Sequence, residues 1–407
     1  MSIPRVAFFT DSFHEVNGVA LTSREFARFA QQKDHPFLSV HAGPRTCGWA
    51  DGCFETFELK NSRFVLELDT NLLFDLLFFR HYVRLRRKLQ EFRADLVHVT
   101  GPGHCGLLGA ILAHSLGVPL VASWHTNLHE FAGRRLDKLL TGFPLTVRSR
   151  AANIAEAGAL SLTLQFYRLA RVLFAPNPEL VDLLATRTGR PTHLMLRGID
   201  TQLFAPAHRD RSDDEFTIGY VGRLSPEKNV RLLAEIERGL IAAGLRNYRF
   251  LAIGDGSERA WLATHMQRCE TPGILRGIEL ARAYAGMDAF VFPSETDTFG
   301  NVVLEAMASG VPAIVRAVGG PKYLVQNGIN GFQALNADDF AASLLALTRN
   351  PALRNEMAAN ARQHALAFSW NGVFEGVYKH YEQALASGLL SSPKRISRAR
   401  SVASTLA

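Results

Sequence analysis

Short apolar runs alternate with amphipathic stretches along most of the chain. In the first half, the runs typical of buried parallel strands are Val6–Thr10, Phe37–His41, Leu96–Thr100, Leu120–His125 and Val172–Pro176. A second series consists of Phe216–Val221, Phe250–Gly254, Gly273–Arg276, Ala289–Pro293 and Ala313–Arg316. Stretches with helical periodicity separate the runs in both series. This alternation predicts an α/β fold with two doubly wound, Rossmann-like domains.

A polar segment rich in Asp, Arg and Pro separates the two series and reads as a linker. A chain of 407 residues is too long for one hydrophobic core and suits two domains, which implies a cleft between them. The predicted organisation is an N-terminal domain over residues 1–200, a linker over 201–215, a C-terminal domain over 216–368, a final helix over 369–390 and a flexible basic tail over 391–407.

The absence of several sequence patterns argues against several classes of protein. The longest apolar stretch, Leu72–Phe79, is interrupted by Asp75 and is far shorter than the roughly 20 residues that cross a bilayer. The N-terminus lacks the pattern of a secretory signal, so we expect a cytoplasmic protein. The 4 cysteines form no CxxC pair and no regular His/Cys spacing, so we predict no metal site. No GxGxxG follows the first strand of either half, and no P-loop motif occurs.

The segment Phe292–Pro312 carries the strongest chemical signal. It reads as a strand end, a short loop and a helix that begins near Gly300. The backbone amides of Phe299, Gly300 and Asn301 would form an anion site, because unpaired amides and the helix dipole both favour negative charge. Gly300 would keep the approach to these amides open.

Two acids of the same segment are candidates for sugar recognition. Glu305 lies one turn into the expected helix, where its carboxylate would accept hydrogen bonds from a sugar diol, and Asp297 in the loop would hold a second sugar. The plainer interpretation is that Asp297 caps the helix and Glu305 is a solvated helical residue. Pattern alone leaves both interpretations open.

Arg223 and Lys228 follow the first strand of the second half and precede a helix expected near Asn229. Fixed Arg and Lys donors in a dry cleft would stabilise the charge that develops on a departing diphosphate, without a metal. Taken in isolation, the pair would be surface charges around a turn that contains proline.

Two features of the first half point to the same cleft. Asn17 and Gly18 form a sharp turn before a helix, so the backbone can approach a phosphate or sugar closely. His125 ends an apolar strand and should lie at the carboxyl edge of the sheet, where ligands bind in open α/β folds. A lone histidine in such a place is more commonly structural.

These motifs together resemble the family-four retaining glycosyltransferases. The acids Asp297 and Glu305 before Ala-Met-Ala-Ser-Gly-x-Pro resemble the paired-acid motif of that family, which usually has Glu at the first position. Gly-Arg-Leu-x-x-Glu-Lys-Asn around Arg223 and Lys228 resembles its diphosphate-binding motif. Shorter matches include the glycines Gly254 and Gly277; Arg197 stands where the family commonly has Asn.

The resemblance implies a GT-B fold, net retention at the anomeric carbon and no cofactor or metal, with a nucleotide sugar as substrate. It implies that the donor contacts Gly18, Arg223, Lys228, Gly254, Gly277, Asp297, Phe299, Gly300, Asn301 and Glu305. It gives catalytic roles to His125, Asp297, Arg223 and Lys228, with His125 as a hydrogen-bond donor to the transferred sugar, and acceptor contacts to Asn17, Gly18 and His125. The final helix is expected to cross back onto the N-terminal domain.

The amino-acid sequences of the motifs are most similar to those of GDP-mannose-dependent α-mannosyltransferases. Enzymes that use UDP-sugars share nearly all of these residues. An epimerase or hydrolase of the same fold and a catalytically silent sugar- or lipid-binding module are the competing hypotheses. Nucleic acid is not an expected partner, since no DNA- or RNA-binding motif is present.

The net charge of +7 favours an anionic partner. Residues 71–92 read as one helix with an apolar side and the cations Arg80, Arg84, Arg86, Arg87 and Lys88. Such a helix can lie on an anionic membrane, which makes a lipid or glycan acceptor and peripheral attachment reasonable expectations. An ordinary packing helix with a solvated basic face is the alternative.

Overall fold

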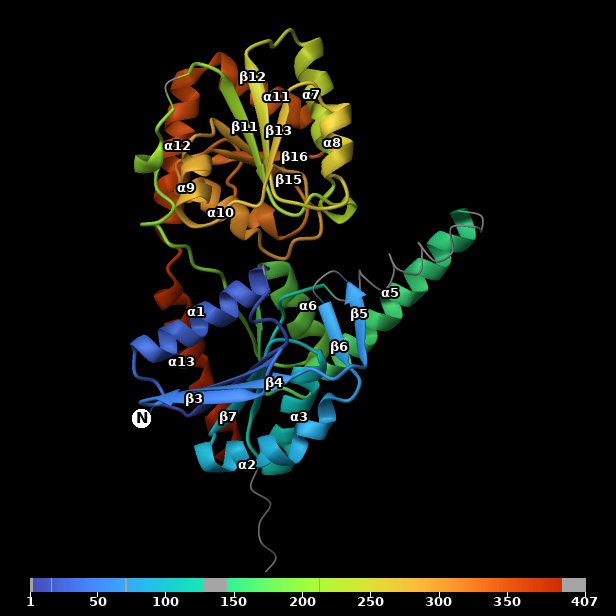
Figure 1. Ribbon diagram of the computed structural model, residues 1–407, viewed down its shortest axis with the longest axis vertical. Coiled ribbons are helices and arrows are strands. Elements are labelled where there is room, and N and C mark those ends of the chain that lie inside the picture. Colours follow the sequence, from blue (N-terminus) through green and yellow to red (C-terminus); the bar gives the residue numbers. More distant parts are fainter. Residues whose placement is uncertain (1–2, 16, 70–71, 128–144, 212, 390–407) are drawn as a thin grey trace, which may run out of the picture.

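The computed structural model describes residues 3–15, 17–69, 72–127, 145–211 and 213–389. Figure 1 shows two α/β bodies, one above the other, each built on its own sheet. The predicted fold of two Rossmann-like domains is confirmed. The proposed basic tail over 391–407 lies outside the described residues, and the domain boundaries stay a prediction.

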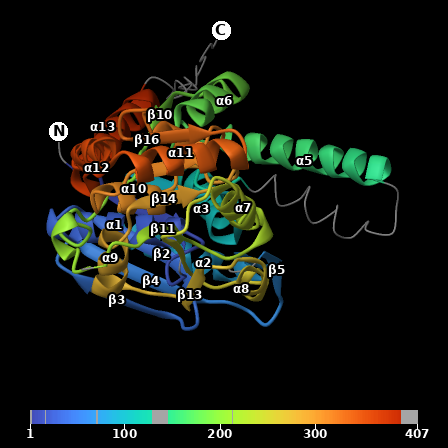
Figure 2. The same ribbon diagram turned by 90° about the horizontal axis from the view of Figure 1, so that it is seen from above.

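The N-terminal sheet has the strand order β10-β9-β8-β7-β1-β2-β4-β3, and only β3 runs antiparallel to its neighbour. Its strands are β1 Val6–Thr10, β2 Phe37–Gly43, β3 Cys47–Asp51, β4 Phe54–Lys60, β7 Leu96–Val99, β8 Leu120–Ser123, β9 Val172–Ala175 and β10 Thr192–Leu194. The helices of this part are α1 Gly18–Gln32, α2 Tyr82–Phe92, α3 His104–Leu116, α5 Leu145–Tyr167 and α6 Pro178–Thr188. Of these, α5 projects away from the rest (Figures 1 and 2).

The C-terminal sheet is parallel throughout, in the order β13-β12-β11-β14-β15-β16. Its strands are β11 Phe216–Val221, β12 Tyr248–Ile253, β13 Cys269–Gly273, β14 Ala289–Phe292, β15 Ala313–Arg316 and β16 Gly331–Ala334. Its helices are α7 Leu232–Ala242, α8 Arg259–His265, α9 Gly277–Ala285, α10 Asn301–Ala308, α11 Ala337–Arg349 and α12 Pro351–Ala365, with short 3-10 turns η2 Pro206–His208, η3 Pro226–Lys228 and η4 Gly320–Tyr323. The strand order reverses between β11 and β14, and ligands of doubly wound sheets bind at such a switch point.

The last helix, α13 Trp370–Leu389, lies against the N-terminal domain. The Phe374 ring stacks on Phe26 at a centroid distance of 4.4 Å. Deeper in the domain, the Tyr381 hydroxyl lies 2.6 Å from Nδ1 of the buried His98. Aromatic stacking and a buried hydrogen bond therefore fix the C-terminal part of the chain to the first domain.

The helix predicted over 71–92 is wrong in its first half. The described part of that segment forms β6 Leu72–Asp75, paired with β5 Val65–Asp69, then η1 Phe78–His81, and only then α2. Asp75 is fully buried and accepts hydrogen bonds from the Ser62 hydroxyl at 2.5 Å and from the Leu77 amide at 2.9 Å. An Asp that binds the amide two residues ahead makes a turn, which interrupts a helix.

Some strands also differ from the sequence prediction. The strand predicted at Gly273–Arg276 lies earlier, at Cys269–Gly273, and ends where Gly273 adopts a φ of +94°. Strands β3, β4, β10 and β16 were not predicted. Three of them, β3, β10 and β16, are short strands at sheet edges, and β4 lies inside the sheet but is only partly buried. The helix predicted near Asn229 begins at Leu232, after a 3-10 turn.

Candidate functional site

Two glycine loops meet beside the switch point of the C-terminal sheet, at the ends of β11 and β12. Gly222 follows β11 and Gly254 follows β12, and a Cβ atom on Gly254 would lie 1.9 Å from the Gly222 carbonyl oxygen. Gly254 also has a φ of +142°, which side chains rarely allow. Glycine at position 254 therefore permits a backbone contact that shapes the floor of the site.

Lys228 and Asp297 form the ion pair beside this floor. The Lys228 ammonium donates to both carboxylate oxygens of Asp297, at 2.7 and 2.8 Å, and the Ser294 hydroxyl donates to one of them at 2.5 Å. Both charged side chains are partly exposed, so the pair faces solvent on one side. Arg223 lies in the preceding loop, where it contacts Glu227 at 3.4 Å. An ammonium has three hydrogens, so Lys228 can keep Asp297 and still donate to a phosphate.

The N-terminus of α10 is built as an open donor site. Gly300 caps the helix with a φ of +98°, a left-handed conformation that favours glycine. No described residue accepts a hydrogen bond from the backbone amides of Phe299, Gly300 or Asn301. The Gly319-Gly320-Pro321 segment packs behind the loop, and the Gly320 amide donates to the Asp297 carbonyl at 2.7 Å.

A second helix N-terminus faces the first across the domains. The Asn17 side chain caps α1 by accepting from the Ala20 amide at 2.8 Å, and Gly18 is the first residue of that helix. A Cβ atom on Gly18 would lie 3.2 Å from the Asn301 side-chain nitrogen at the start of α10. Both helix dipoles are therefore positive toward the same gap, which favours an anion there.

Glu305 lies one turn inside α10 and is partly buried. The Tyr284 hydroxyl of α9 donates to its carboxylate at 2.8 Å. Burial raises the pKa of Glu305 from 4.5 to about 7, although the hydrogen bond from Tyr284 lowers it somewhat. Near neutral pH this carboxyl therefore exists in both protonation states.

His125 follows β8 and is buried, and both of its ring nitrogens have partners. The Arg197 guanidinium donates to Nδ1 at 2.9 Å, and the Ser123 hydroxyl lies 2.7 Å from Nε2. Because Arg is only a donor, Nδ1 must be an acceptor and the ring hydrogen belongs on Nε2. Burial, and then the charge of Arg197, lower the pKa of His125 well below its usual range. The ring is neutral, and its Nε2 hydrogen points to Ser123.

Direct hydrogen bonds join the two halves of the site. The Thr298 hydroxyl donates to the His125 carbonyl at 2.9 Å, and the Asn177 side-chain amide donates to the Thr298 carbonyl at 2.7 Å. Arg197 lies over the Phe299 ring at 6.0 Å from its centroid. The catalytic residues proposed in each domain thus lie around one interdomain junction.

The structure brings most of the predicted residues together. Gly18, His125, Lys228, Asp297 and the segment from Phe299 to Asn301 surround the junction, whereas Gly277 begins α9 with open space around it. Residues that sequence reasoning did not assign to the site are Ser123, Asn177, Tyr284, Ser294 and Thr298. Only Ser294 and Thr298 carried a signal, since they lie inside the acid motif.

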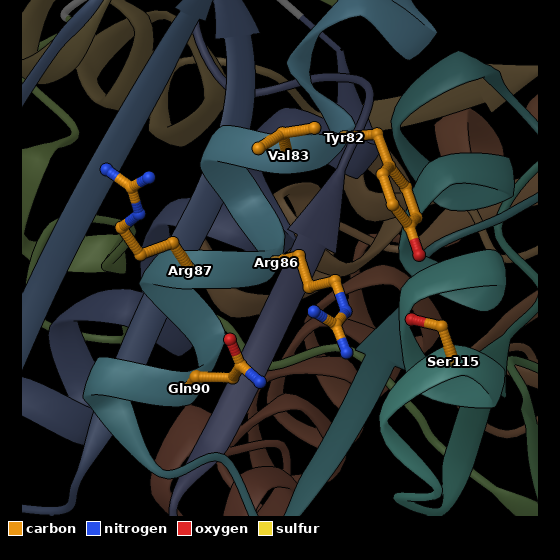
Figure 3. A pocket seen from close by; sticks show the side chains of 6 residues that line it. All are labelled: Tyr82, Val83, Arg86, Arg87, Gln90 and Ser115. Carbon is orange, nitrogen blue, oxygen red and sulfur yellow. The ribbon is translucent and has the colours of Figure 1, made fainter.

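A separate hollow of about 420 Å³ lies on the N-terminal domain between α2 and α3. It is lined by Tyr82, Val83, Arg86, Arg87, Gln90 and Ser115. Arg86 and Tyr82 point toward α3, whereas Arg87 points away from it (Figure 3). Helix α2, which carries most of the lining, lies at the end of the N-terminal domain remote from the C-terminal domain (Figure 1).

Within the part of the chain that the structure describes, no helix combines the length and apolarity needed to cross a bilayer.

Comparison with known proteins agrees with this geometry. A family model described as Glycosyltransferase Family 4 matches residues 16–234, and one described as Glycosyl transferases group 1 matches residues 215–350. A GDP-mannose-dependent alpha-mannosyltransferase of Mycobacterium tuberculosis is 35% identical over 307 residues, which cover 74% of this chain and 75% of that protein. A protein of the same name from Corynebacterium glutamicum is 27% identical over 395 residues, or 94% of this chain and 89% of that protein.

Solved structures share the fold at low identity. Sucrose-phosphate synthase from Thermosynechococcus elongatus has a TM-score of 0.70 and 18% identity, and the match covers 94% of this chain and 99% of that one. Anabaena HepE in complex with UDP and glucose has a TM-score of 0.63 and 16% identity, with coverages of 93% and 99%. With its GT-B fold and its matches over most of its length, the chain belongs to glycosyltransferase family 4 and is a glycosyltransferase.

Proposed function

We propose that the protein transfers mannose from GDP-mannose to an acceptor hydroxyl with retention of the anomeric configuration. The observation that carries the proposal is the junction at which the N-termini of α1 and α10 face each other beside Lys228. A nucleoside diphosphate placed there would meet two positive helix ends and at least one ammonium. The relatives named as GDP-mannose-dependent enzymes support the choice of donor.

In this proposal the chain supplies charge stabilisation rather than a nucleophile. As the bond from sugar to phosphate breaks, negative charge grows on the leaving diphosphate, and Lys228, Arg223 and the free amides of α10 stabilise it. Asp297 holds Lys228 in place and remains available to a sugar hydroxyl. The leaving phosphate oxygen then takes the proton of the acceptor hydroxyl on the same face of the sugar, which gives retention without a covalent intermediate.

Glu305 would bind the donor, and His125 would position the groups at the junction. The Glu305 carboxylate accepts hydrogen bonds from the donor, in its ionised form. His125 has both nitrogens engaged, so we assign it a positioning role at the junction in place of the expected donation to the sugar. Its backbone carbonyl accepts a hydrogen bond from Thr298 of the C-terminal domain.

Calorimetric titration of the purified protein with GDP and with UDP, without added metal, tests the donor. Tighter binding of GDP supports the proposal, and tighter binding of UDP replaces mannose with a UDP-linked sugar. Binding of neither nucleotide favours a silent sugar- or lipid-binding module. Incubation with GDP-mannose and a panel of lipid and glycan acceptors, followed by NMR of the new anomeric bond, tests retention; an inverted product would overturn the mechanism.

A membrane contact through α2 is a second proposal, which would hold the enzyme near a lipid acceptor. Some of the cations expected to face the membrane are already paired with carboxylates, Arg80 with Asp75 and Lys88 with Glu55. Arg86 and Arg87 pair with no described carboxylate, and Val83 beside them is 69% exposed. A cationic rim around an exposed apolar residue fits an anionic headgroup layer.

Co-sedimentation with vesicles of phosphatidylcholine, with and without phosphatidylglycerol, tests this contact. We expect binding that depends on the anionic lipid and is lost in the Arg86→Gln/Arg87→Gln double variant. A double variant that binds as the parent does, or parent binding that ignores phosphatidylglycerol, would contradict a contact at α2.

A further inference from the structure

A cluster of metal-ligating side chains lies on the N-terminal sheet, away from its switch point. His41 on β2 and Glu58 on β4 are register partners on neighbouring parallel strands. Side chains at paired positions of a sheet point to the same face, and His14 reaches them from the loop after β1. The strand order of this sheet reverses between β1 and β7. The cluster lies on the opposite side of β1, at β2 and β4.

The ligand atoms are spaced for a shared cation. Nε2 of His14 lies 3.1 Å from Oε2 of Glu58, and Nε2 of His41 lies 3.8 Å from the same oxygen. One ligand atom from each of the three residues lies within 4.8 Å of the other two. A tetrahedral zinc ion with bonds of about 2.0–2.2 Å holds its ligand atoms about 3.4 Å apart, so small side-chain rotations would close the site.

The buried histidine of the cluster has few polar partners in the described structure. His41 is 3% exposed, and its Nδ1 has no hydrogen-bond partner. Its Nε2 reaches only the Glu58 carboxylate, at 3.8 Å, which is beyond a hydrogen bond. Nε2, which faces Glu58, is the nitrogen that would bind an ion, and it is a different atom from the unpartnered Nδ1.

The other parts of the cluster are held in place. Phe13 stacks on the His41 ring at a centroid distance of 4.0 Å. The Arg45 amide donates to the second Glu58 oxygen at 2.9 Å. A Cβ atom on Gly43 would lie 2.5 Å from the Glu58 carboxyl carbon, so only glycine leaves room for the carboxylate there. Support of this kind around ligands is a regular feature of metal sites.

We propose that His14, His41 and Glu58 bind one zinc ion, with solvent completing the coordination. Two imidazoles and a carboxylate are a common protein ligand set for zinc. The ion would tie the loop that carries His14 to β2 and β4, and the same loop leads to Asn17 and Gly18 at the start of α1. Zinc would thus stabilise the geometry of the cleft edge, without a part in the bond-breaking step. The proposal does not depend on the identity of the donor.

The test measures zinc itself, in protein from which exposed thiols have been removed. Cys47 and Cys53 are exposed and would bind zinc independently, so the parent for the experiment carries Cys47→Ser and Cys53→Ser. After treatment with a chelator, calorimetry with zinc chloride should give one ion per chain. His14→Ala and Glu58→Gln should weaken that binding at least about 100-fold, whereas His114→Ala, an exposed histidine on α3, should leave it unchanged.

His14 is exposed, so its substitution leaves the core intact, and circular dichroism confirms the fold of each variant. X-ray absorption of the zinc-loaded parent should show nitrogen and oxygen neighbours at about 2.0–2.2 Å and no sulfur. Failure of the parent to bind zinc, or an unchanged affinity in His14→Ala, would overturn the site. Either result is independent of nucleotide binding, which is measured in the same proteins.

Discussion

The raised pKa of Glu305 makes Glu305→Gln the most informative substitution in the C-terminal domain. Gln keeps the shape of Glu and can still accept the hydrogen bond from Tyr284, but it has no charge to bury. We expect the variant to be more stable than the parent at alkaline pH and to bind the donor nucleotide poorly. One substitution therefore separates the stability effect of the carboxyl from its role in binding.

The magnitude follows from the pKa in the folded and unfolded chain. The folded value of about 7 exceeds the usual 4.5, so the folded state prefers the protonated form. The free energy of unfolding of the parent, relative to that of the variant, therefore decreases as pH rises from 4.5 to about 7. Above that range the difference between the two proteins is constant. At about 1.4 kcal/mol per pKa unit, the full difference is about 3 kcal/mol at pH 8 and about 1 kcal/mol at pH 5.

Urea unfolding of parent and variant at pH 5 and pH 8 measures this difference. GDP titration over the same range provides the functional readout, since the proposed function requires an ionised Glu305 for binding. We expect the parent's affinity to fall about tenfold from pH 8 to pH 6, and the variant's weak affinity to be independent of pH. A stability difference that is the same at both pH values would refute the raised pKa, whatever the nucleotide data show.

Three further substitutions test other parts of the site. Lys228→Ala should lower kcat/KM for donor turnover at least about 100-fold with unchanged circular dichroism, because it removes a donor to the diphosphate; near-normal turnover would contradict the assignment. Arg197→Met should lower the free energy of unfolding by about 3 kcal/mol in urea, since it leaves His125 Nδ1 and two carbonyl groups without a donor; an unchanged value would show that these contacts matter little. Gly254→Ala should lower the Tm far more than Gly189→Ala, which has a φ of +68° but no atom within 4 Å of the added Cβ, and equal shifts would remove the argument from the contact with Gly222.

Much of the site was predictable because its signals are local. The loop before α10 and the glycines around Arg223 are contiguous motifs, and their chemistry follows from neighbouring residues in the chain. The proposed zinc cluster shows the opposite case, since His14 comes from the loop after β1, His41 from β2 and Glu58 from β4, and their spacing in the sequence forms no motif. The prediction of no metal site rested on Cys and His spacing and on the family resemblance, and neither contains information about ligands that a sheet brings together.

Arg197 illustrates the same limit within the candidate site. The sequence marked it only as a departure from the usual Asn, whereas the fold places its guanidinium on His125 and thereby decides which ring nitrogen holds the hydrogen. The error over 71–92 has a related cause, because the turn at Asp75 depends on Ser62 and on pairing with β5. The helical periodicity of a segment contains no information about contacts with residues from another segment.

The sequence by itself determined the alternation of strands and helices, the two sheets and the candidate anion-binding loops, because periodicity and backbone chemistry act over a few residues. Only the tertiary structure decided that the N-termini of α1 and α10 face each other, that burial moves the pKa of Glu305 to about 7, and that the ring of His125 is neutral and fully engaged. These properties depend on distances between atoms that are far apart in the chain, and on how much water the assembled domains exclude.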